Sequence, residues 1–596
     1  MKVELRNEEV GMRCMRICYL NYLKARPFTD YEDSVALNVQ GNIDMGNINH
    51  SRSFATDFLS CVANIIQNRV KVFLSNPMIQ TGFKPPVKII ADKDTRKHRT
   101  RQLVSILIVV PDADSLIQPI YLGHPVVMHH TGKGVTDSII SVADDYIIKE
   151  QYEGGSYDGQ YHHLSVPEYL NEHYEVQPCD VHSDHDLLHK TGIVDKHIRK
   201  DPKFIWLCNI TSQISKVFKD FNYGKKYEKL IGACESLDIS LKDPKFFSDT
   251  RFANSCFNVY SSFLTDLPAI IKCLEDTAKL VNSNNVKERD FARSAKEVLN
   301  RIRNKVFVLT LSGIVDIHSK ISLIVSIVQK VNKLPYQRYD EFVSVVKSLE
   351  TMKITLNDHS KCKNNDKAKC LWPKLHSNID LIKSGEFKIG PEILMEKESD
   401  PQILTRQATE LSISQTVDDV EKSYLKRLDD LVSRIRDDML GNVYTKEEEE
   451  MIQVIRRITY WSTLAFRSNR LGPVLIETLE SSQYLLDSRK NLRSLRDVPD
   501  CIITNQFKIF VHRLHKETKN MPIDNITNTD SKDFIKQFLK TELYIYKDME
   551  MIIAATVVGC IKLGLESLAE SMISKYNLHS SHLSHQLAWM MQCIMK

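Results

Sequence analysis

Two aspartates stand at the ends of apolar segments and could hold a divalent cation. Asp92 directly follows the apolar run VKIIA (residues 87–91), and Asp158 lies in GGSYDGQYHH, where glycines let a backbone approach a ligand closely. A carboxylate at the end of a buried strand, beside clustered cations, suits a metal-assisted phosphate site. A solvated hairpin tip at Asp92 and an ordinary Asp-Gly turn at Asp158 are the simpler alternatives.

Basic side chains gather in two places where they could contact phosphate groups. The first cluster follows Asp92 and comprises Lys93, Arg96, Lys97, Arg99 and Arg101. The second comprises Lys196, His197, Arg199, Lys200 and Lys203. Either cluster could bind the backbone of a nucleic acid. A solvated basic face is the alternative for both.

A third candidate lies in the segment CDVHSDHDLLHK, whose possible metal ligands are Cys179, His182, His185 and His189. Their spacings of three, three and four residues would place several of them on one face of a helix, as in some zinc sites. Pairing of the histidines with the intervening aspartates on a surface helix explains the pattern equally well.

Two glutamates, Glu566 and Glu570, lie one turn apart in LGLESLAESMISKY (residues 563–576), a segment otherwise of small and apolar residues with helical spacing. Carboxylates on such a face must be paired, bind a metal or lie at the rim of the packed face. Simple exposure at the surface is the alternative.

The elements that would position these residues change in type along the chain. Residues 1–80 have helical spacing, clearest at 52–74, whereas residues 87–91, 103–110 and 116–122 are short apolar runs typical of strands. A helix is expected at 136–149 with Thr136 as its cap, and a fourth strand or its exit loop at 154–159. From about residue 200 onward the pattern is helical, clearest at 306–331, 339–352, 417–439, 447–471 and 534–576, with exposed loops at 357–369 and 524–532. This order predicts an α/β (α+β) core followed by many helices.

The composition is that of a folded intracellular protein. The chain has 596 residues, 42% apolar and 26% charged, which is long enough for two or more domains and unlike a disordered protein. Its formal net charge of +4 is too small to indicate a dedicated nucleic-acid binder. No signal peptide is visible, and the best apolar run, residues 551–561, is shorter than the roughly 20 residues that span a bilayer. We therefore expect a soluble chain with reduced cysteines and no membrane partner.

Taken in order, these segments resemble those of hAT superfamily transposases and their domesticated relatives. VKIIADKDTRKHRTRQLVSILIVV is similar to the family's first catalytic segment, with Asp92 at the first aspartate, and YEGGSYDGQYHH to the second, with Asp158 at the second aspartate. ESLAESMIS resembles the Ser-x-x-x-Glu-x-x-Phe-Ser element, which places Glu570 as the third carboxylate and Glu566 at the first serine.

Two further motifs of the family have partial counterparts. The family's Cys-x-x-His pair could be Cys179 with His182, or Asp186 with His189 if the aspartate replaces the cysteine. SDTRFANSCF resembles the Thr-Arg-Trp segment near the start of the family's helical insertion, with Phe252 in place of tryptophan.

The resemblance implies an RNase H-like core, a mixed five-stranded sheet flanked by helices and interrupted by a large all-helical insertion, in a chain that is predominantly helical overall. The implied parts are an N-terminal helical region (1–84), the first part of the core (85–270), the insertion (271–545) and a C-terminal return helix of the core (546–596). Asp92, Asp158 and Glu570 would be the catalytic ligands of Mg²⁺ or Mn²⁺, the hard cations that carboxylates bind. DNA would be the partner, contacted by Lys93, Arg96, Lys97, Arg99 and Arg101, and the protein would act in the nucleus.

Two departures from the family's pattern shape the expected function. The first 80 residues contain no Cys-x-x-Cys and His array of a BED-type zinc finger, and little of the family's dimerisation signature surrounds Glu570. We therefore expect a transposase-derived protein that binds DNA with reduced or lost transposition activity, and whose helices could form a homo-oligomer. The alternatives are an active Mg²⁺-dependent DNA cleavage and transfer enzyme and a helical protein-interaction scaffold.

Overall fold

The computed structural model describes residues 2–24, 26–96, 99–178, 181–185, 187–247, 252–330, 333–356, 370–384, 417–479, 486, 493–540 and 548–563. The chain divides into two compact units. The sheet unit comprises Met1–Asp186, Gln329–Arg338 and Lys446–Lys596, and the helical unit comprises Leu187–Val328 and Tyr339–Thr445. The expected helical insertion was placed at 271–545, so the division found here begins and ends earlier in the sequence.

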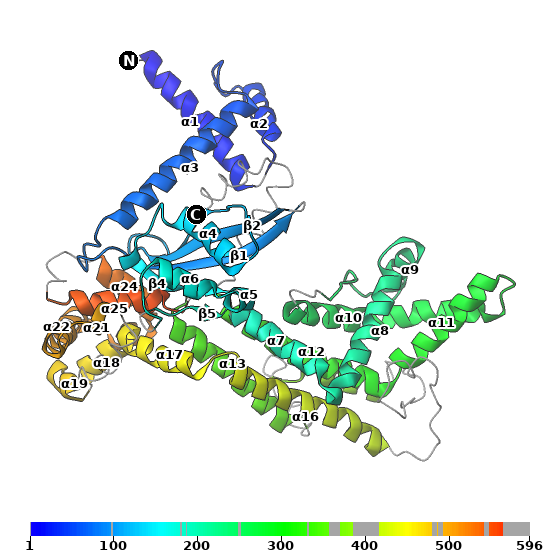
Figure 1. Cartoon of the computed structure of the whole chain (residues 1–596). Coiled ribbons are helices and arrows are strands. Elements are labelled where there is room, and N and C mark those ends of the chain that lie inside the picture. Colours follow the sequence, from blue (N-terminus) through cyan, green and yellow to red (C-terminus); the bar gives the residue numbers. More distant parts are fainter. Residues whose placement is uncertain are drawn as a thin grey trace. The chain divides into compact units, whose positions relative to one another are not determined.

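The sheet is mixed and has five strands, as predicted (Figure 1). Its strands are β1 (Val87–Arg96), β2 (Arg99–Val109), β3 (Ile117–Gly123), β4 (Tyr152–Tyr157) and the very short β5 (Asp184–His185). Their order across the sheet is β3-β2-β1-β4-β5, and only β2 runs opposite to the others. The first three strands overlap the three apolar runs that predicted them, and the fourth strand lies where a strand or its exit loop was expected.

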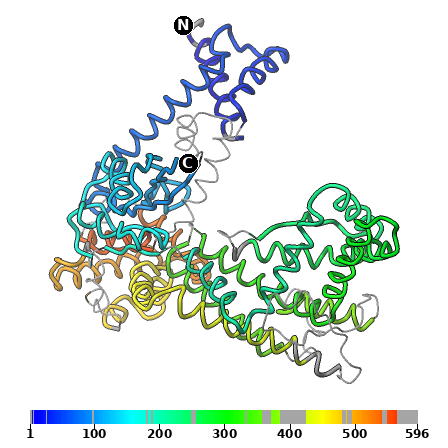
Figure 2. The backbone as a smooth tube through the Cα atoms, turned by 45° about the vertical axis from the view of Figure 1, so that its right-hand side comes forward, coloured from blue at the N-terminus to red at the C-terminus, as the bar shows by residue number. Residues whose placement is uncertain are grey.

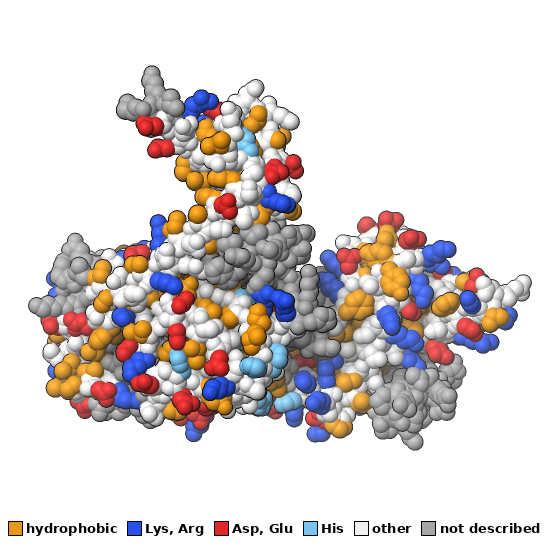
Figure 3. Space-filling view, turned by 45° about the horizontal axis from the view of Figure 1, so that its top comes forward, with side chains coloured by type: hydrophobic (Ala, Val, Ile, Leu, Met, Phe, Trp, Pro, Cys, Tyr) orange, Lys and Arg blue, Asp and Glu red, His pale blue; other side chains and the backbone are white. Residues whose placement is uncertain are grey.

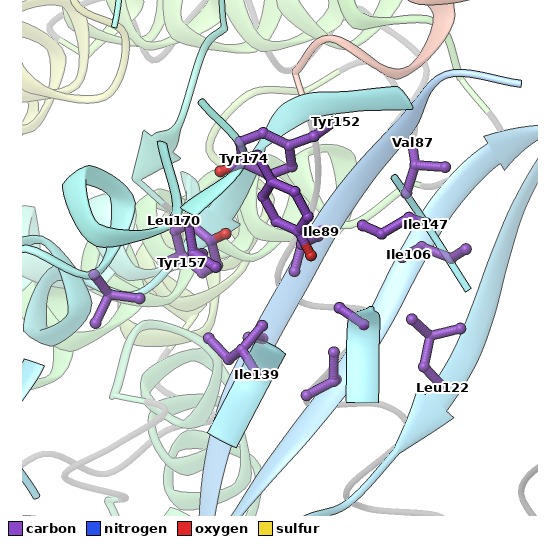
Figure 4. Close-up of a cluster of buried hydrophobic side chains, with 14 of the residues drawn as sticks. Val87, Ile89, Ile106, Leu122, Ile139, Ile147, Tyr152, Tyr157, Leu170 and Tyr174 are labelled. Carbon is purple, nitrogen blue, oxygen red and sulfur yellow. The ribbon is translucent and has the colours of Figure 1, made fainter. Parts of the chain in front are cut away.

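One face of the sheet is covered by helices that follow β3 and β4. These are α4 (Gly132–Ala143), α5 (Gly159–His163) and α6 (Val166–His173). The core beneath them is built from alternate residues of the strands, including Ile89 and Tyr152, and the Tyr152 ring stacks on Tyr174 with centroids 4.6 Å apart (Figure 4). Because the sheet is covered, β2 is buried along most of its length and reads as a nearly continuous apolar run.

The start of α4 corrects one expectation. Thr131, not Thr136, is the N-cap of this helix, and its side chain accepts a hydrogen bond from the Gly134 amide. Thr136 lies inside the helix and donates its hydroxyl to the Gly132 carbonyl. The helix therefore begins earlier than predicted, because the two glycines at its start weakened the helical pattern in the sequence.

The C-terminal part of the described chain returns to the sheet. Helix α25 (Glu550–Ile561) packs against β2, and the two views of the backbone both place it beside the strands (Figure 2). All residues from Ile552 to Ile561 are buried, which is the pattern of a helix enclosed on every side. The predicted long helix at 534–576 is therefore at least two elements, because α24 (Ser531–Leu539) ends well before α25 begins.

The remaining helices of the sheet unit lie at the N-terminus and between Lys446 and α25. Helix α3 begins and ends almost where the apolar spacing predicted, and Ser51 caps it. The loop expected at 524–532 is wrong, because α23 and the start of α24 occupy it; Pro522 precedes α23 and Asp530 caps α24. The bounds are α1 (Lys2–Leu23), α2 (Thr29–Gln40), α3 (Arg52–Ser75), the 3₁₀ turn Lys149–Gln151, α17 (Lys446–Thr459), α18 (Trp461–Leu471), α19 (Pro473–Leu479), α21 (Arg493–Arg496), α22 (Asp500–Thr518) and α23 (Ile523–Asn528).

In its described part, the helical unit is built entirely from helices around α12. Helix α12 packs against α7, α10, α15 and α16. The bounds are α7 (Leu187–Lys200), α8 (Ile205–Phe221), α9 (Gly224–Ser236), α10 (Phe252–Ala278), α11 (Val286–Ile302), α12 (Lys305–Val328), α13 (Pro335–Thr355), which begins in the sheet unit, α15 (Pro373–Ser384), α16 (Val417–Asn442) and the 3₁₀ turns Pro202–Phe204 and Lys279–Asn282. The predicted loop at 357–369 lies outside the described residues.

Helix α12 is also the only described helix long and apolar enough to cross a membrane by length and composition. Within its most apolar window, 72% is buried inside the protein. Helix α12 is longer than residues 551–561, which were expected to be the best apolar run. Its burial among other helices is that of a core helix.

The surface carries both signs of charge. Over the face seen in Figure 3, basic and acidic side chains are interspersed and no single basic stripe dominates. This agrees with the small net charge of the sequence, and on this face a polyanion would meet only local groups of basic side chains.

Candidate functional site

Asp92 and Asp158 lie at matching positions of neighbouring parallel strands. Strands β1 and β4 are parallel, with Ile90 paired to Ser156. Asp92 is two residues beyond Ile90 in β1, and Asp158 is two residues beyond Ser156, directly after β4. The register therefore places the two aspartates at the same level of neighbouring strands. Asp158 follows the end of β4, as expected, whereas β1 continues past Asp92 to Arg96, so Asp92 lies within its strand and not at its end.

Each aspartate is held by local hydrogen bonds. The Asp92 Oδ1 accepts the Lys93 amide at 2.7 Å. The Asp92 carbonyl accepts Gln102 Nε2 at 2.9 Å, and the Tyr161 hydroxyl donates to Gln102 Oε1 at 2.9 Å. Asp158 is the N-cap of α5 and accepts the Gln160 amide. The turn at Asp158 is thus a helix start, and it fixes the carboxylate at the sheet edge.

Lys93 belongs electrostatically to this site. Its ammonium lies 5.0 Å from the centroid of the Tyr161 ring. Burial lowers the pKa of Lys93, while the charges of Asp158 and Asp92 act in the opposite direction. The two carboxylates therefore have a cation beside them that comes from the chain itself.

The rest of the first basic cluster lies on the β1–β2 hairpin. Arg99 begins β2 and is exposed, whereas Arg101 is half-buried and stands opposite Asp94 in the strand register. Position 97 and the side chain of Arg96 lie outside the described residues. Arg99 is therefore the described side chain of this cluster best placed to meet a phosphate.

The second basic cluster requires a correction at Arg199, which faces the protein interior. Its side chain is 15% exposed and donates to Asp195, Thr211 and Tyr260, each at 2.9 Å. A guanidinium used this way cannot contact a phosphate at the surface. The sequence concealed this because Arg199 lies among exposed basic neighbours.

The third carboxylate of the predicted set lies outside the described residues, and so does Glu566. The last described residues before them are firmly anchored. The Lys562 carbonyl accepts the ammonium of Lys88, and the Leu563 carbonyl accepts Arg338 Nη2 at 2.6 Å. The chain thus passes the N-terminal half of β1 shortly before it reaches Glu566 and Glu570.

Sequence reasoning missed a buried group of four charges beneath α25. The Lys88 ammonium pairs with Asp184, and the Lys562 ammonium pairs with Glu153 at 3.1 Å. All four side chains are at most 4% exposed. Two cations and two anions balance, which is the condition for burying charges. The signal was Lys88 itself, a lysine between Val87 and Ile89 in an apolar strand.

The helical face that would have supported the histidine-rich zinc candidate is not present. His182 precedes β5, His185 lies in β5 and His189 lies in α7, so these three do not share one helical face. Cys179 lies outside the described residues. A two-residue strand has too little periodicity to be distinguished from a helix in the sequence.

Among the described residues, one group of three side chains has the geometry to hold a metal ion. Asp195, Cys256 and His318 are all buried, and one possible ligand atom from each lies within 4.8 Å of the other two. The group lies in the helical unit, on α7, α10 and α12, and was not foreseen. The hard ions Mg²⁺ and Mn²⁺ were expected instead at Asp92, Asp158 and Glu570, the last of which lies outside the described residues.

Comparison with known proteins adds no relative to this description, since no protein-family model and no curated protein matches the chain.

Proposed function

We propose that this chain is a transposase-derived protein of the hAT type, with an RNase H-like core, that binds DNA at the carboxyl edge of β1 and β4. The observation that carries the proposal is the strand register, which aligns Asp92 with Asp158. Each of these residues follows an apolar run in the sequence, and the resemblance assigns them to the family's first and second catalytic aspartates.

The architecture supports the same proposal. The resemblance implies a mixed five-stranded sheet interrupted by a helical insertion, with a return to the core near the C-terminus. The chain has a mixed five-stranded sheet, then a compact helical unit, and then α25 against β2. An RNase H-like core accounts for all three features with one topology.

The carboxylate oxygens of the two aspartates fit a hard divalent cation, whereas the positive charge of Lys93 opposes the binding of that cation. Asp92 and Asp158 would hold Mg²⁺ or Mn²⁺, which in this class of site activates a nucleophile and stabilises the leaving oxygen during phosphoryl transfer. The Lys93 ammonium already supplies positive charge to both carboxylates. Its presence weakens cation binding, and this favours a DNA-binding protein with reduced or lost catalysis, acting in the nucleus.

The hairpin that extends β1 and β2 provides the proposed contact with the DNA backbone. Arg99 and Arg101 lie next to the aspartate edge on this hairpin. Phosphate contacts give salt-dependent affinity, with a slope of about −0.9 per neutralised phosphate on a plot of log affinity against log salt. Removing contacts should therefore reduce the slope in proportion.

The test is a salt titration of binding to fluorescently labelled duplex DNA, read by anisotropy. We expect Arg99→Glu/Arg101→Glu to weaken binding and to reduce the salt slope by about 2. The matched control is Lys279→Glu/Arg293→Glu, which reverses two exposed cations of the helical unit and should leave the slope unchanged. Absence of salt-dependent binding by the unmodified protein, or equal slopes for the two variants, would overturn the proposal.

The second candidate function is an active Mg²⁺-dependent DNA cleavage and transfer enzyme. It is favoured by the alignment of Asp92 with Asp158 and needs Glu570 as the third ligand. Metal-dependent nicking of duplex DNA should then disappear in Asp92→Asn and Glu570→Gln and persist in Glu566→Gln. DNA binding without nicking by the unmodified protein would rule out the enzyme and leave the binding proposal standing.

A further inference from the structure

The helical unit contains a cluster whose members come from three helices that pack together. Asp195 is on α7, Cys256 on α10 and His318 on α12, and these residues are 4%, 0% and 1% exposed. They are far apart in the sequence, so only the fold brings them within 4.8 Å of one another. The cluster plays no part in the function proposed above.

The hydrogen bonding of His318 fixes which ring nitrogen presents a lone pair. Nδ1 lies 2.9 Å from the Ile314 carbonyl, which can only accept, so Nδ1 carries the proton. Nε2 is buried, has no hydrogen-bond partner and lies 3.7 Å from Asp195 Oδ1. A neutral imidazole in this position directs a lone pair at a carboxylate oxygen. A positive charge between the two atoms, either a proton on Nε2 or a metal ion, must relieve their repulsion.

The distances and the supporting bonds favour a metal ion. A hydrogen bond between Nε2 and Oδ1 would need about 2.7–2.9 Å, shorter than the observed separation. Two ligands of a tetrahedral ion with bonds of about 2.0–2.1 Å lie roughly 3.4 Å apart. The partner of a ligating histidine is commonly a backbone carbonyl on its other nitrogen, and Ile314 supplies one.

The neighbouring Arg199 orients two of the possible ligands. Its Nε binds Asp195 Oδ2 at 2.9 Å, which leaves Oδ1 directed toward His318. Its Nη2 lies 3.5 Å from Cys256 Sγ; burial raises the pKa of this thiol, and the positive charge of Arg199 acts against that rise. The guanidinium also repels a cation, so the site needs two anionic ligands to bind one.

We propose that Asp195 Oδ1, Cys256 Sγ and His318 Nε2 bind one Zn²⁺-class ion that joins α7, α10 and α12. The thiol proton leaves to solvent when the ion binds, and water completes the tetrahedron. A thiolate with an imidazole and a carboxylate selects Zn²⁺ over Mg²⁺, which prefers oxygen ligands alone. Because the site is buried at a junction of helices, its role is to stabilise the helical unit.

The test uses the full chain and the metals Zn²⁺ and Co²⁺. Metal analysis after loading with Zn²⁺ and dialysis should show one Zn²⁺ per chain attributable to the cluster. Co²⁺ should give a thiolate-to-metal charge-transfer band and the intense visible bands of a tetrahedral site. Absence of the charge-transfer band in the unmodified protein would overturn the proposal without any variant.

Variants locate the site. Cys256→Ser and His318→Gln should lose the Co²⁺ band and bind Zn²⁺ at least about tenfold more weakly. Cys208→Ser is the control, because the Cys208 thiol donates to the Arg199 carbonyl at 3.3 Å and has no place among the ligands. It should keep the band. A chelator should lower the thermal midpoint of the unmodified protein and of Cys208→Ser alone. A band retained in Cys256→Ser would refute the assignment.

Discussion

Replacing Lys93 by glutamine is the sharpest test of whether Asp92 and Asp158 can bind a divalent cation and whether the lysine charge weakens that binding. Glutamine keeps a polar side chain of similar length and removes the positive charge that acts on Asp158 and Asp92. For a unit charge on the order of 6 Å from a divalent ion, with an effective dielectric constant of about 40–80, the repulsion is ~1.4–2.8 kcal/mol. We therefore expect Lys93→Gln to tighten Mn²⁺ binding by about 10- to 100-fold.

The assay is a titration of Mn²⁺ followed by loss of the paramagnetic resonance signal of the free ion. Lys71→Gln is a matched control in the same unit, since the Lys71 ammonium also lies over a tyrosine ring, at 4.9 Å, and beside one aspartate, at 3.6 Å. Asp92→Asn added to Lys93→Gln should abolish the gain, which separates this edge from any other metal site. If Lys93→Gln binds Mn²⁺ no better than the unmodified protein, the electrostatic reasoning is refuted.

Three further predictions concern stability, each measured as a shift in the unfolding transition of the unit concerned. Gly154→Ala should lower the free energy of unfolding by about 2 kcal/mol or more, because this glycine has φ +94° and an added Cβ would meet a backbone carbonyl. Gly192→Ala, in a helix with open space around it, should raise the free energy of unfolding by about 0.5–1 kcal/mol, and equal effects of the two substitutions would contradict the argument. Lys88→Met should cost about 3–5 kcal/mol, since Asp184 would remain buried without its partner, and a neutral outcome would show that the carboxyl simply takes up a proton. Burial raises the pKa of Asp266 to about 6. Between about pH 4 and 6 the native state therefore keeps a proton that the unfolded chain has lost. Above this range the buried carboxylate is charged and destabilises the native state. Asp266→Asn should therefore stabilise by about 1–3 kcal/mol near pH 8 and by little near pH 4, and a difference independent of pH would exclude this cause.

The parts of the fold that the sequence predicted are those with strong local patterns. The apolar runs beginning at residues 87, 103 and 116 became β1, β2 and β3, because each contains enough buried β-branched residues to define a strand. Helix α3 was equally clear, since its apolar residues recur with helical spacing for 24 residues. Asp92 and Asp158 could be expected on neighbouring strands because each directly follows a predicted strand, but the polar continuation of β1 past Asp92 has no apolar pattern and was not predicted.

The parts that were missed depend on contacts between distant segments. Strand β5 has two residues and is defined only by its pairing with β4, so no local sequence pattern predicts it. The cluster of Asp195, Cys256 and His318 comes from three helices, and nothing in the sequence indicates that they meet. Arg199 looked like a surface cation because its neighbours are charged, and only the packing of α7 against α10 shows that it is internal.

The contrast between Lys88 and Asp92 explains where a ligand can reach the sheet. Four residues apart on one strand, they lie on the same face. Lys88 is fully buried because the carbonyl of Lys562, at the end of α25, and the carboxylate of Asp184 close over its ammonium. Asp92 lies past that cover and is partly exposed. The end of α25 therefore covers the part of this face around Lys88, where charges must balance internally, whereas the Asp92 side chain farther along the strand stays partly exposed.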